Sequence, residues 1–416
     1  MLFFCYNNCK LRNQRTQCFE NIGSATGAST RNFSAEKYPC SQSIVCADFV
    51  TYRQLKKQIR FIFVIQKSML NIKKLGVVLE PTNLAFEKKA VLNPGVWQEG
   101  NRIQMFYRAI AEDACSTIGY ALLDGPTKVV ERWGRPIINR EFSYESKGIE
   151  DPRIVKIGKT FYIFYVAHDG KNAITAYATS KDLKTFEKKG IISPLIPYHE
   201  FDKLNDDLRI KDSYSFFSSF FEEGAGKDVL LWHKDVFIFP RKIQGRYALL
   251  QRVLPDMQIT FFDNFRQLKD KNFWLEQLRH LPDQVVLENK HWFESRNIGG
   301  GCPPIETKEG WIIIFHGVEE TNKGRVYHAC AALLDLENPL KVIGRLHEPL
   351  FSPTEPWEAQ GFVSNVVFPT GTAQFGDDLY IYYGAADTRI AVALVSLKEL
   401  LAEMQDPAKR HDYGKK

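Results

Sequence analysis

The chain has 416 residues, of which 44% are apolar and 13% aromatic, with 55 Lys and Arg residues against 49 Asp and Glu residues. These totals are typical of a globular protein that buries a large core, and they exclude a chain too small to form one. The formal charge of +6 would favour a nucleic-acid or anionic-membrane partner if it lay on one face. However, residues 1–68 hold ten basic and only three acidic side chains, which leaves 45 basic and 46 acidic ones in the other 348 residues. We therefore expect no nucleic-acid and no membrane partner.

Residues 1–68 also differ in cysteine content and patterning. They hold five of the eight cysteines, and their apolar runs are too short for a membrane span or a secretory signal. We expect this segment to be a disordered or non-native extension, with Met69 as the natural start of the protein. The remaining Cys115, Cys302 and Cys330 form neither a disulfide framework nor a zinc-ligand pattern. A reducing compartment, the cytoplasm, fits best.

From Leu70 onward the chain repeats a β pattern. Turns centred on glycines 100, 158, 245, 310 and 376 each join a β run to an aromatic-rich strand, which a third apolar run follows. Their separations are 58, 87, 65 and 66 residues. Five such units predict an all-β fold, a five-bladed β-propeller over residues 69–405 with a polar tail at 406–416. A β-sandwich with a coincidental rhythm is the alternative.

Two segments interrupt the β pattern. The 87-residue gap predicts an insertion at residues 196–228. Residues 264–281 predict a short amphipathic helix, because Phe273, Trp274, Leu278 and Leu281 are spaced to cover one face.

Polar residues lie where the inner strands of a propeller would meet around a channel. They are Arg108, His168, Arg252, His316 and Asp387, together with Glu150, Asp151, Pro152 and Arg153. Pro152 restricts the residue before it, so Asp151 would be held rigidly, as a carboxyl that protonates a glycosidic oxygen must be. Arginines aimed into one channel without matching acids would attract an anion. An Asp-Pro turn cap and salt-bridged arginines are the structural alternatives.

The order of longer motifs from Leu75 to Leu401 resembles glycoside hydrolase family 130, whose members are mainly β-mannoside phosphorylases with a minority of hydrolases. The motifs are Asn93-Pro94-Gly95, Phe106-Tyr107-Arg108-Ala109, Gly148-Ile149-Glu150-Asp151-Pro152-Arg153, Lys234-Asp235, Gly299-Gly300-Gly301-Cys302-Pro303-Pro304, Phe315-His316-Gly317 and Tyr382-Tyr383-Gly384-Ala385-Ala386-Asp387. The resemblance implies a five-bladed propeller that cleaves β-mannosides with inorganic phosphate as co-substrate. It implies no cofactor and no metal, and the nine histidines show no metal-ligand spacing. Members of the family often form homo-oligomers.

The resemblance also implies roles for particular residues. Asp151 would be the general acid and would protonate the leaving oxygen through the 3-hydroxyl of the mannosyl unit, while phosphate attacks the anomeric carbon from the opposite face. The implied phosphate ligands are Lys234, Arg252, His316 and Tyr327. The implied sugar ligands are Asn93, Arg108 and Asp387. Tyr107, Trp357 and Phe362 are aromatic side chains that either stack on sugar rings or belong to the core.

One departure from the family pattern leaves the nucleophile open. Phosphorylases usually place a phosphate-binding lysine where this chain has Asn297, and Arg296 beside it would face the opposite side of a strand. Hydrolytic members instead activate water with a carboxylate, and Glu294 is the candidate base for that reaction. Lys234 and Arg252 favour phosphorolysis to α-mannose 1-phosphate. A β-mannosidase and a noncatalytic sugar-binding propeller remain the alternatives.

Overall fold

The structure, a computed structural model, describes residues 70–205 and 210–406. Their architecture is mainly β-strand with a few helices, which confirms the predicted all-β class. The predictions for residues 1–68 and for most of the tail at 406–416 lie outside the described residues. Among the described helices, none is long and apolar enough to cross a membrane.

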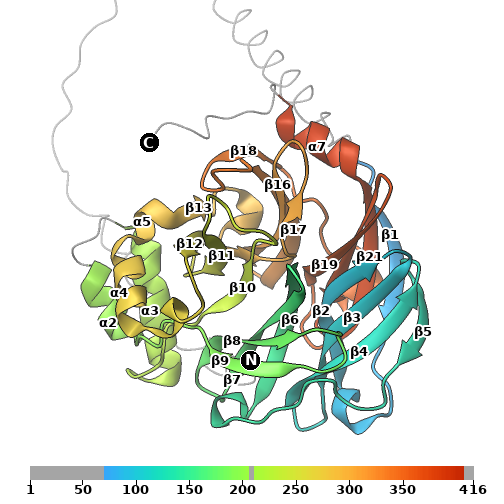
Figure 1. The fold of residues 1–416 in the computed structure, drawn as a ribbon, viewed down its shortest axis with the longest axis horizontal. Coiled ribbons are helices and arrows are strands. Elements are labelled where there is room, and N and C mark those ends of the chain that lie inside the picture. Colours follow the sequence, from blue (N-terminus) through green and yellow to red (C-terminus); the bar gives the residue numbers. More distant parts are fainter. Residues whose placement is uncertain (1–69, 206–209, 407–416) are drawn as a thin grey trace, which may run out of the picture. The chain divides into compact units, whose positions relative to one another are not determined.

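The strands form five antiparallel groups that follow one another along the chain (Figure 1). The first group consists of β2 (Ala90–Glu99), β3 (Arg102–Ile110), β4 (Ser116–Asp124) and β5 (Lys128–Arg132). The second consists of β6 (Gly148–Ile157), β7 (Thr160–His168), β8 (Ala173–Ser180) and β9 (Glu187–Ile191). The third consists of β10 (Lys234–Ile238), β11 (Tyr247–Arg252), β12 (Met257–Phe262) and β13 (Val285–Leu287).

The last two groups follow the same plan with small changes. The fourth consists of β14 (Asn297–Gly300), β15 (Ile305–Glu306), β16 (Trp311–Thr321), β17 (Gly324–Leu334) and β18 (Val342–Arg345). The fifth consists of β19 (Val367–Phe375), β20 (Asp378–Ala385), β21 (Arg389–Ser396) and β1 (Lys73–Leu79). The first strand of the described chain therefore completes the last group, which ties the two ends of this β region together. A single parallel pair, Ser116 with Gly148, joins the first two groups into one eight-stranded sheet.

The first strands of the groups lie next to one another. β2 contacts β6 and β19, β10 contacts β6 and β14, and the fourth group reaches β19 through β16 and β17. Val96, Ile154, Pro240, Pro303 and Thr372, from all five groups, line one common pocket at the far ends of these strands. Buried apolar side chains fill the space between adjacent groups.

The glycine turns predicted from the sequence are the turns between the first and second strands. Gly100, Gly158, Gly245, Gly310 and Gly376 all have positive φ, from 59° to 153°. Only glycine adopts such backbone angles at little cost, so the repeat seen in the sequence is a repeat of turn geometry.

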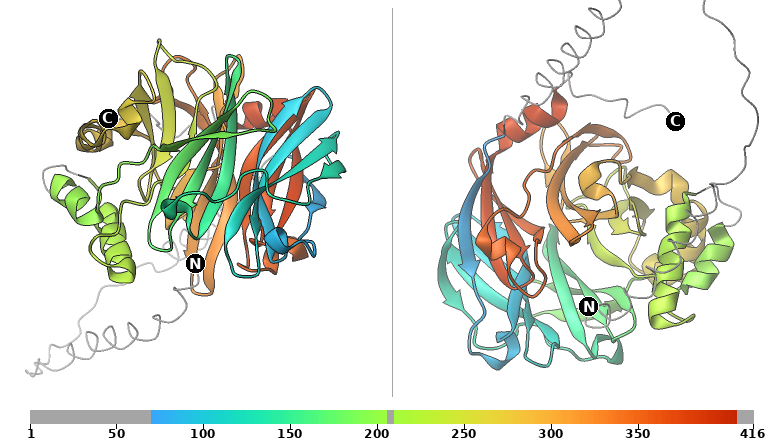
Figure 2. Two further views of the ribbon diagram at one scale, coloured as in Figure 1. Left: turned by 60° about the horizontal axis from the view of Figure 1, so that its bottom comes forward. Right: turned by 180° about the vertical axis from the view of Figure 1, so that it is seen from behind.

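Five of the described helices lie in or beside the two segments that interrupt the β pattern. The insertion at 196–228 contains α2 (Tyr198–Asn205) and α3 (Asp212–Ala225), which lie at the outer edge of the strand groups (Figure 2). The second segment contains η3 (Gln267–Lys269), α4 (Lys271–Arg279) and α5 (Leu281–Gln284). Trp274, Leu278 and Leu281 are fully buried there and Phe273 is partly buried, as the predicted apolar face requires. The last described helix is α7 (Leu397–Gln405).

A buried glutamate recurs before the first strand of four groups. It lies in the short helices η1 (Ala85–Glu87), η2 (Ser143–Glu145), η4 (Trp292–Glu294) and α6 (Pro356–Ala359). The four residues, none of which is exposed to solvent, are Glu87, Glu145, Glu294 and Glu358. Each forms an ion pair with a cation on the outermost strand of its own group, in the same order Arg132, Lys188, Arg345 and Lys74. These pairs join the inner and outer edges of these four groups.

Glu145 shows the arrangement in full. One of its oxygens accepts hydrogen bonds from the backbone N–H groups of Glu141 and Phe142 and lies 2.7 Å from Nζ of Lys188. The other accepts a 2.9 Å hydrogen bond from the hydroxyl of Tyr165 on β7. Both carboxylate oxygens have partners, and removing the cation would leave a buried charge uncompensated.

Replacing Lys188 by Met should therefore lower the free energy of unfolding by about 3–5 kcal/mol, because it leaves the Glu145 carboxylate buried without its cation. The neighbouring Lys189 pairs with the exposed Glu187, so Lys189→Met should cost less than about 1 kcal/mol. Urea unfolding of both variants measures the difference. Equal losses in the two variants would contradict the role assigned to Glu145.

Candidate active site

The candidate site begins with three residues in left-handed backbone conformation near the starts of β2, β6 and β10. Asn93, Asp151 and Asp235 have φ angles of 49°, 50° and 58°. Each lies at a register shift between the first and second strands of its group, which is the mark of a β-bulge. Asn and Asp tolerate this conformation better than other side chains, and a bulge redirects the side chain. The same backbone device thus places a polar group at matching positions in three groups.

Asp151 lies in a network of hydrogen bonds and ion pairs. Nδ2 of Asn93 donates a 2.8 Å hydrogen bond to Oδ1 of Asp151, and a guanidinium nitrogen of Arg108 lies 3.7 Å from the same oxygen. Glu150 accepts a 2.6 Å hydrogen bond from Arg108 and lies 3.6 Å from Nζ of Lys234. Burial opposes the charge of Glu150, yet Arg108 and Lys234 lower its pKa to about 2. Glu150 therefore stays ionised and links a predicted sugar ligand to a predicted phosphate ligand.

A second network surrounds Asp235. A guanidinium nitrogen of Arg252 lies 2.8 Å from Oδ2, one of Arg153 lies 3.8 Å from Oδ1, and Nε2 of His316 lies 4.0 Å from Oδ2. Burial opposes ionisation, but the nearby cations, Arg252 first, hold the pKa of Asp235 below its ordinary value. Burial also lowers the pKa of His316 to about 3, so this imidazole is neutral at pH 7.

Tyr327 and Asp387 complete the group of predicted residues. The ring of Tyr327 lies 6.1 Å from that of His316, and burial together with the charge of Asp387 raises the pKa of the phenol. Burial raises the pKa of Asp387 to about 6, opposed by Arg108 and reinforced by Asp151. Asp387 follows β20 and has a left-handed backbone, as does Ala386 before it.

All eight predicted ligand and acid residues therefore lie in one connected region. Two acids that the sequence reasoning left without a role, Glu150 and Asp235, join them. The only sequence signal for these acids is that each stands beside a predicted site residue, in Glu150-Asp151 and Lys234-Asp235. The salt-bridged alternative for the arginines holds in part, because Arg108, Lys234, Arg153 and Arg252 each contact one of the two carboxylates. Strand register brings these charges together across groups, which no local pattern reveals.

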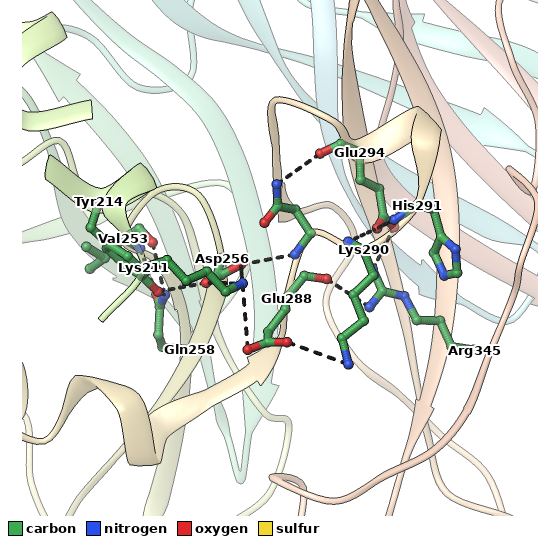
Figure 3. Close-up of polar contacts among 11 residues, drawn as sticks. Lys211, Tyr214, Val253, Asp256, Gln258, Glu288, Lys290, His291, Glu294 and Arg345 are labelled. Atoms are coloured by element: carbon green, nitrogen blue, oxygen red, sulfur yellow. Dashed lines mark hydrogen bonds and ion pairs between the residues drawn. The ribbon is translucent and has the colours of Figure 1, made fainter. Parts of the chain in front are cut away.

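Glu294, the candidate hydrolytic base, is a structural residue. Oε2 accepts hydrogen bonds from the backbone N–H groups of Lys290 and His291, and Oε1 accepts a 2.6 Å hydrogen bond from Arg345 (Figure 3). Its carboxylate is fully buried and both of its oxygens bind protein partners, so it is not placed to activate a water molecule in the site. The prediction of Glu294 as a base is wrong. It rests on the proximity of Glu294 to Asn297 in the sequence, but the short helix η4 directs the side chain toward Arg345.

The residues around the departure at Asn297 also have definite places. Arg296 contacts Glu320 at 2.8 Å and lies over the rings of Phe217 and Phe220 of α3, at 5.3 and 5.2 Å. Arg296 therefore packs against the helical insertion. Asn297 is buried, with Nδ2 3.4 Å from the carbonyl oxygen of Ile298.

The three candidate stacking aromatics differ in exposure. Tyr107 is fully buried and donates a hydrogen bond to Glu87, so it belongs to the core. Trp357 is partly buried and packs against a core cluster. Phe362 is 44% exposed, with Nζ of Lys89 4.6 Å from its ring centre. Within the described ranges, no group of three or more His, Cys, Asp or Glu residues is placed to hold a metal ion.

Comparison with known proteins identifies the family. Residues 71–406 match the family model Glyco_hydro_130, described as beta-1,4-mannooligosaccharide phosphorylase. The chain belongs to glycoside hydrolase family 130. A 1,2-beta-oligomannan phosphorylase of Thermoanaerobacter sp. (strain X514) is 32% identical over 345 residues, which is 80% of this chain and 99% of the relative. A beta-1,2-mannobiose phosphorylase of the same organism is 32% identical over 76% of this chain and 93% of the relative.

A solved structure of this family shows the same fold. The beta-1,2-mannobiose phosphorylase from Listeria innocua, in complex with beta-1,2-mannobiose, superposes with a TM-score of 0.61 at 23% identity. The match covers 80% of this chain and 99% of that one. The family resemblance drawn from the motifs is confirmed.

The raised pKa of Asp387 predicts a pH-dependent stability effect of Asp387→Asn. Above pH 6 the carboxylate is charged in both states, and its ionisation costs the folded state about 3 kcal/mol for a pKa about two units above normal. The variant should therefore be more stable than the wild type at pH 8, by up to that amount. The gain should vanish near pH 4, where the folded wild type holds the proton. Urea unfolding at both pH values measures it, and an equal effect at pH 4 and pH 8 would contradict the shift.

Proposed function

We propose that this protein is an inverting β-mannoside phosphorylase built on a five-bladed β-propeller. The five antiparallel groups, the neighbouring first strands and the pocket lined by all five groups support the propeller. The family and the phosphorylase names of the relatives support the reaction. The observation that carries the site assignment is the link from Asp151 through Arg108 and Glu150 to Lys234.

In this proposal Asp151 is the general acid. The bulge and the hydrogen bond from Asn93 hold its carboxyl in one place, which a proton transfer requires. An oxygen of phosphate attacks the anomeric carbon while the bond from that carbon to the leaving oxygen breaks. The proton of Asp151 reaches the leaving oxygen through the 3-hydroxyl of the mannosyl unit. The products are α-mannose 1-phosphate and the shortened sugar, and a proton from the phosphate group restores the acid.

Lys234, Arg252, His316 and Tyr327 are the proposed phosphate ligands. The neutral His316 donates one N–H, and the two cations supply charge. A cradle of this kind aligns the nucleophile with the anomeric carbon, so no base is required. Asn93, Arg108 and Asp387 are the proposed mannosyl ligands.

The relatives that match over most of their length suggest the linkage to test first. Their names specify β-1,2-linked mannosides, whereas a beta-1,4-mannooligosaccharide phosphorylase of Ruminococcus albus matches over 45% of this chain. We therefore propose β-1,2-mannobiose and longer β-1,2-mannosides as substrates. The three unpaired cysteines of the described residues support a cytoplasmic location.

Incubation with β-1,2- and β-1,4-mannobiose, with and without phosphate, tests the reaction. We expect α-mannose 1-phosphate, detected by phosphorus NMR, only when phosphate is present. Turnover to free mannose at the same rate without phosphate would establish a β-mannosidase instead. Mannoside binding without turnover under any condition would establish a sugar-binding propeller.

Asp151→Asn should lower kcat by about 10²–10⁴-fold while mannobiose still binds, because the amide keeps the shape of the acid but has no acidic proton. Asp228→Asn is the matched control, since Asp228 is exposed and pairs only with Lys171 among the described contacts. Calorimetric binding and initial rates separate the two effects. Unchanged kcat in Asp151→Asn would remove Asp151 from the acid role.

A further inference from the structure

Asp235 places a negative charge inside the proposed phosphate cradle. Its side chain is 1% exposed, and its Oδ2 lies 2.8 Å from Arg252 and 4.0 Å from Nε2 of His316, both proposed phosphate ligands. Lys234 is its neighbour in the chain. A phosphate ion held by these three residues therefore lies close to a carboxylate.

The atoms around Asp235 have unused hydrogen-bonding capacity. Among the described residues, Nε of Arg252 and both ring nitrogens of His316 are buried and have no hydrogen-bond partner, and Oδ2 of Asp235 has its ion pair with Arg252 but no further hydrogen bond. Buried polar atoms are nearly always paired in folded proteins, so several orphans at one point indicate a missing ligand. The ligand must offer both acceptors, for Arg252, and a donor, for Oδ2.

Gly299 packs directly against Asp235 and His316. A Cβ atom at residue 299 would lie 2.7 Å from Oδ2 of Asp235 and 2.5 Å from Cε1 of His316, so any larger side chain would collide with both. The glycine therefore lets the backbone of β14 approach these two side chains closely and hold them in place.

We propose that Asp235 selects oxyanions that carry a proton, accepting a hydrogen bond from a P–OH group of phosphate. The inference rests on the proposed phosphorolysis. Phosphate and arsenate keep at least one proton on oxygen at neutral pH, so an oxygen of either ion donates to the carboxylate while the others accept from the cations. Sulfate carries no proton at neutral pH, so it cannot donate a hydrogen bond to the carboxylate. Its oxygen and the carboxylate oxygen would repel each other. A site built around one hydrogen bond rejects an analogue that lacks it because its own buried group is left unpaired.

The alternative role for Asp235 is only to hold Arg252 and Arg153 in place. In that case the anion lies on the far side of the arginines, and sulfate and phosphate bind with similar affinity, since they share charge and shape. The two roles therefore predict different anion selectivity.

The experiment measures inhibition of phosphorolysis by sulfate, and turnover with arsenate, in the wild type and in Asp235→Asn. We expect arsenate to replace phosphate in the wild type, and sulfate to inhibit at least about 100-fold more weakly than phosphate binds. In Asp235→Asn the amide donates a hydrogen bond, so sulfate should become a competitive inhibitor against phosphate, with its inhibition constant lowered at least about tenfold. Asp263→Asn, an exposed site paired with Arg246, should leave both values unchanged.

Two further results keep the inference separate from the proposed function. A wild-type enzyme that is phosphate-dependent yet inhibited by sulfate as strongly as phosphate binds overturns the role of Asp235 and leaves phosphorolysis standing. A wild-type enzyme with no phosphate-dependent turnover overturns the proposed function itself. If Asp235→Asn does not fold, the sulfate and arsenate measurements on the wild type still decide.

Discussion

The arrangement of the site depends on one backbone constraint, the left-handed residue at a bulge near the start of a first strand. Three groups use it, at Asn93, Asp151 and Asp235. A regular strand would direct each of these side chains along the pleat, alternating between the faces of its own sheet. The bulge redirects it, so that side chains from different groups meet. A left-handed non-glycine residue persists only where the surrounding structure holds it, and four of the ten such residues in the described chain, Asn93, Asp151, Asp235 and Asp387, belong to the candidate site.

The buried glutamates are a second constraint, found in four of the five strand groups. In four groups a fully buried carboxylate joins the helix before the first strand to a cation on the last strand. The ion pair spans the group from its inner edge to its outer edge. In the fifth group this pair includes Lys74 on β1, so the same interaction also holds together distant parts of the chain. Glu294 belongs to this scaffold, which is why it is absent from the chemistry.

Each of four cations of the site has a carboxylate partner before any ligand arrives. Glu150 pairs with Arg108 and Lys234, and Asp235 pairs with Arg153 and Arg252. The buried nitrogens of His316 and Arg252 that have no hydrogen-bond partner in the described chain are therefore the groups that remain to bind an anion. Such a site distinguishes between anions by their pattern of hydrogen-bond donors and acceptors. The carboxylate of Asp235 contributes an acceptor to that pattern.

The sequence by itself determined the β class, the positions of the five turns and the family. Each of these follows from short segments of the chain. Turn glycines adopt positive φ, apolar residues have a fixed spacing in a strand or helix, and family motifs are contiguous. The tertiary structure alone decided how charges pair. The link between Asp151 and Lys234, the cations around Asp235 and the burial of Glu294 each depend on strands that lie far apart in the chain. A bulge shifts strand register by one residue, and a one-residue shift reverses the face of every side chain that follows, which no local pattern specifies.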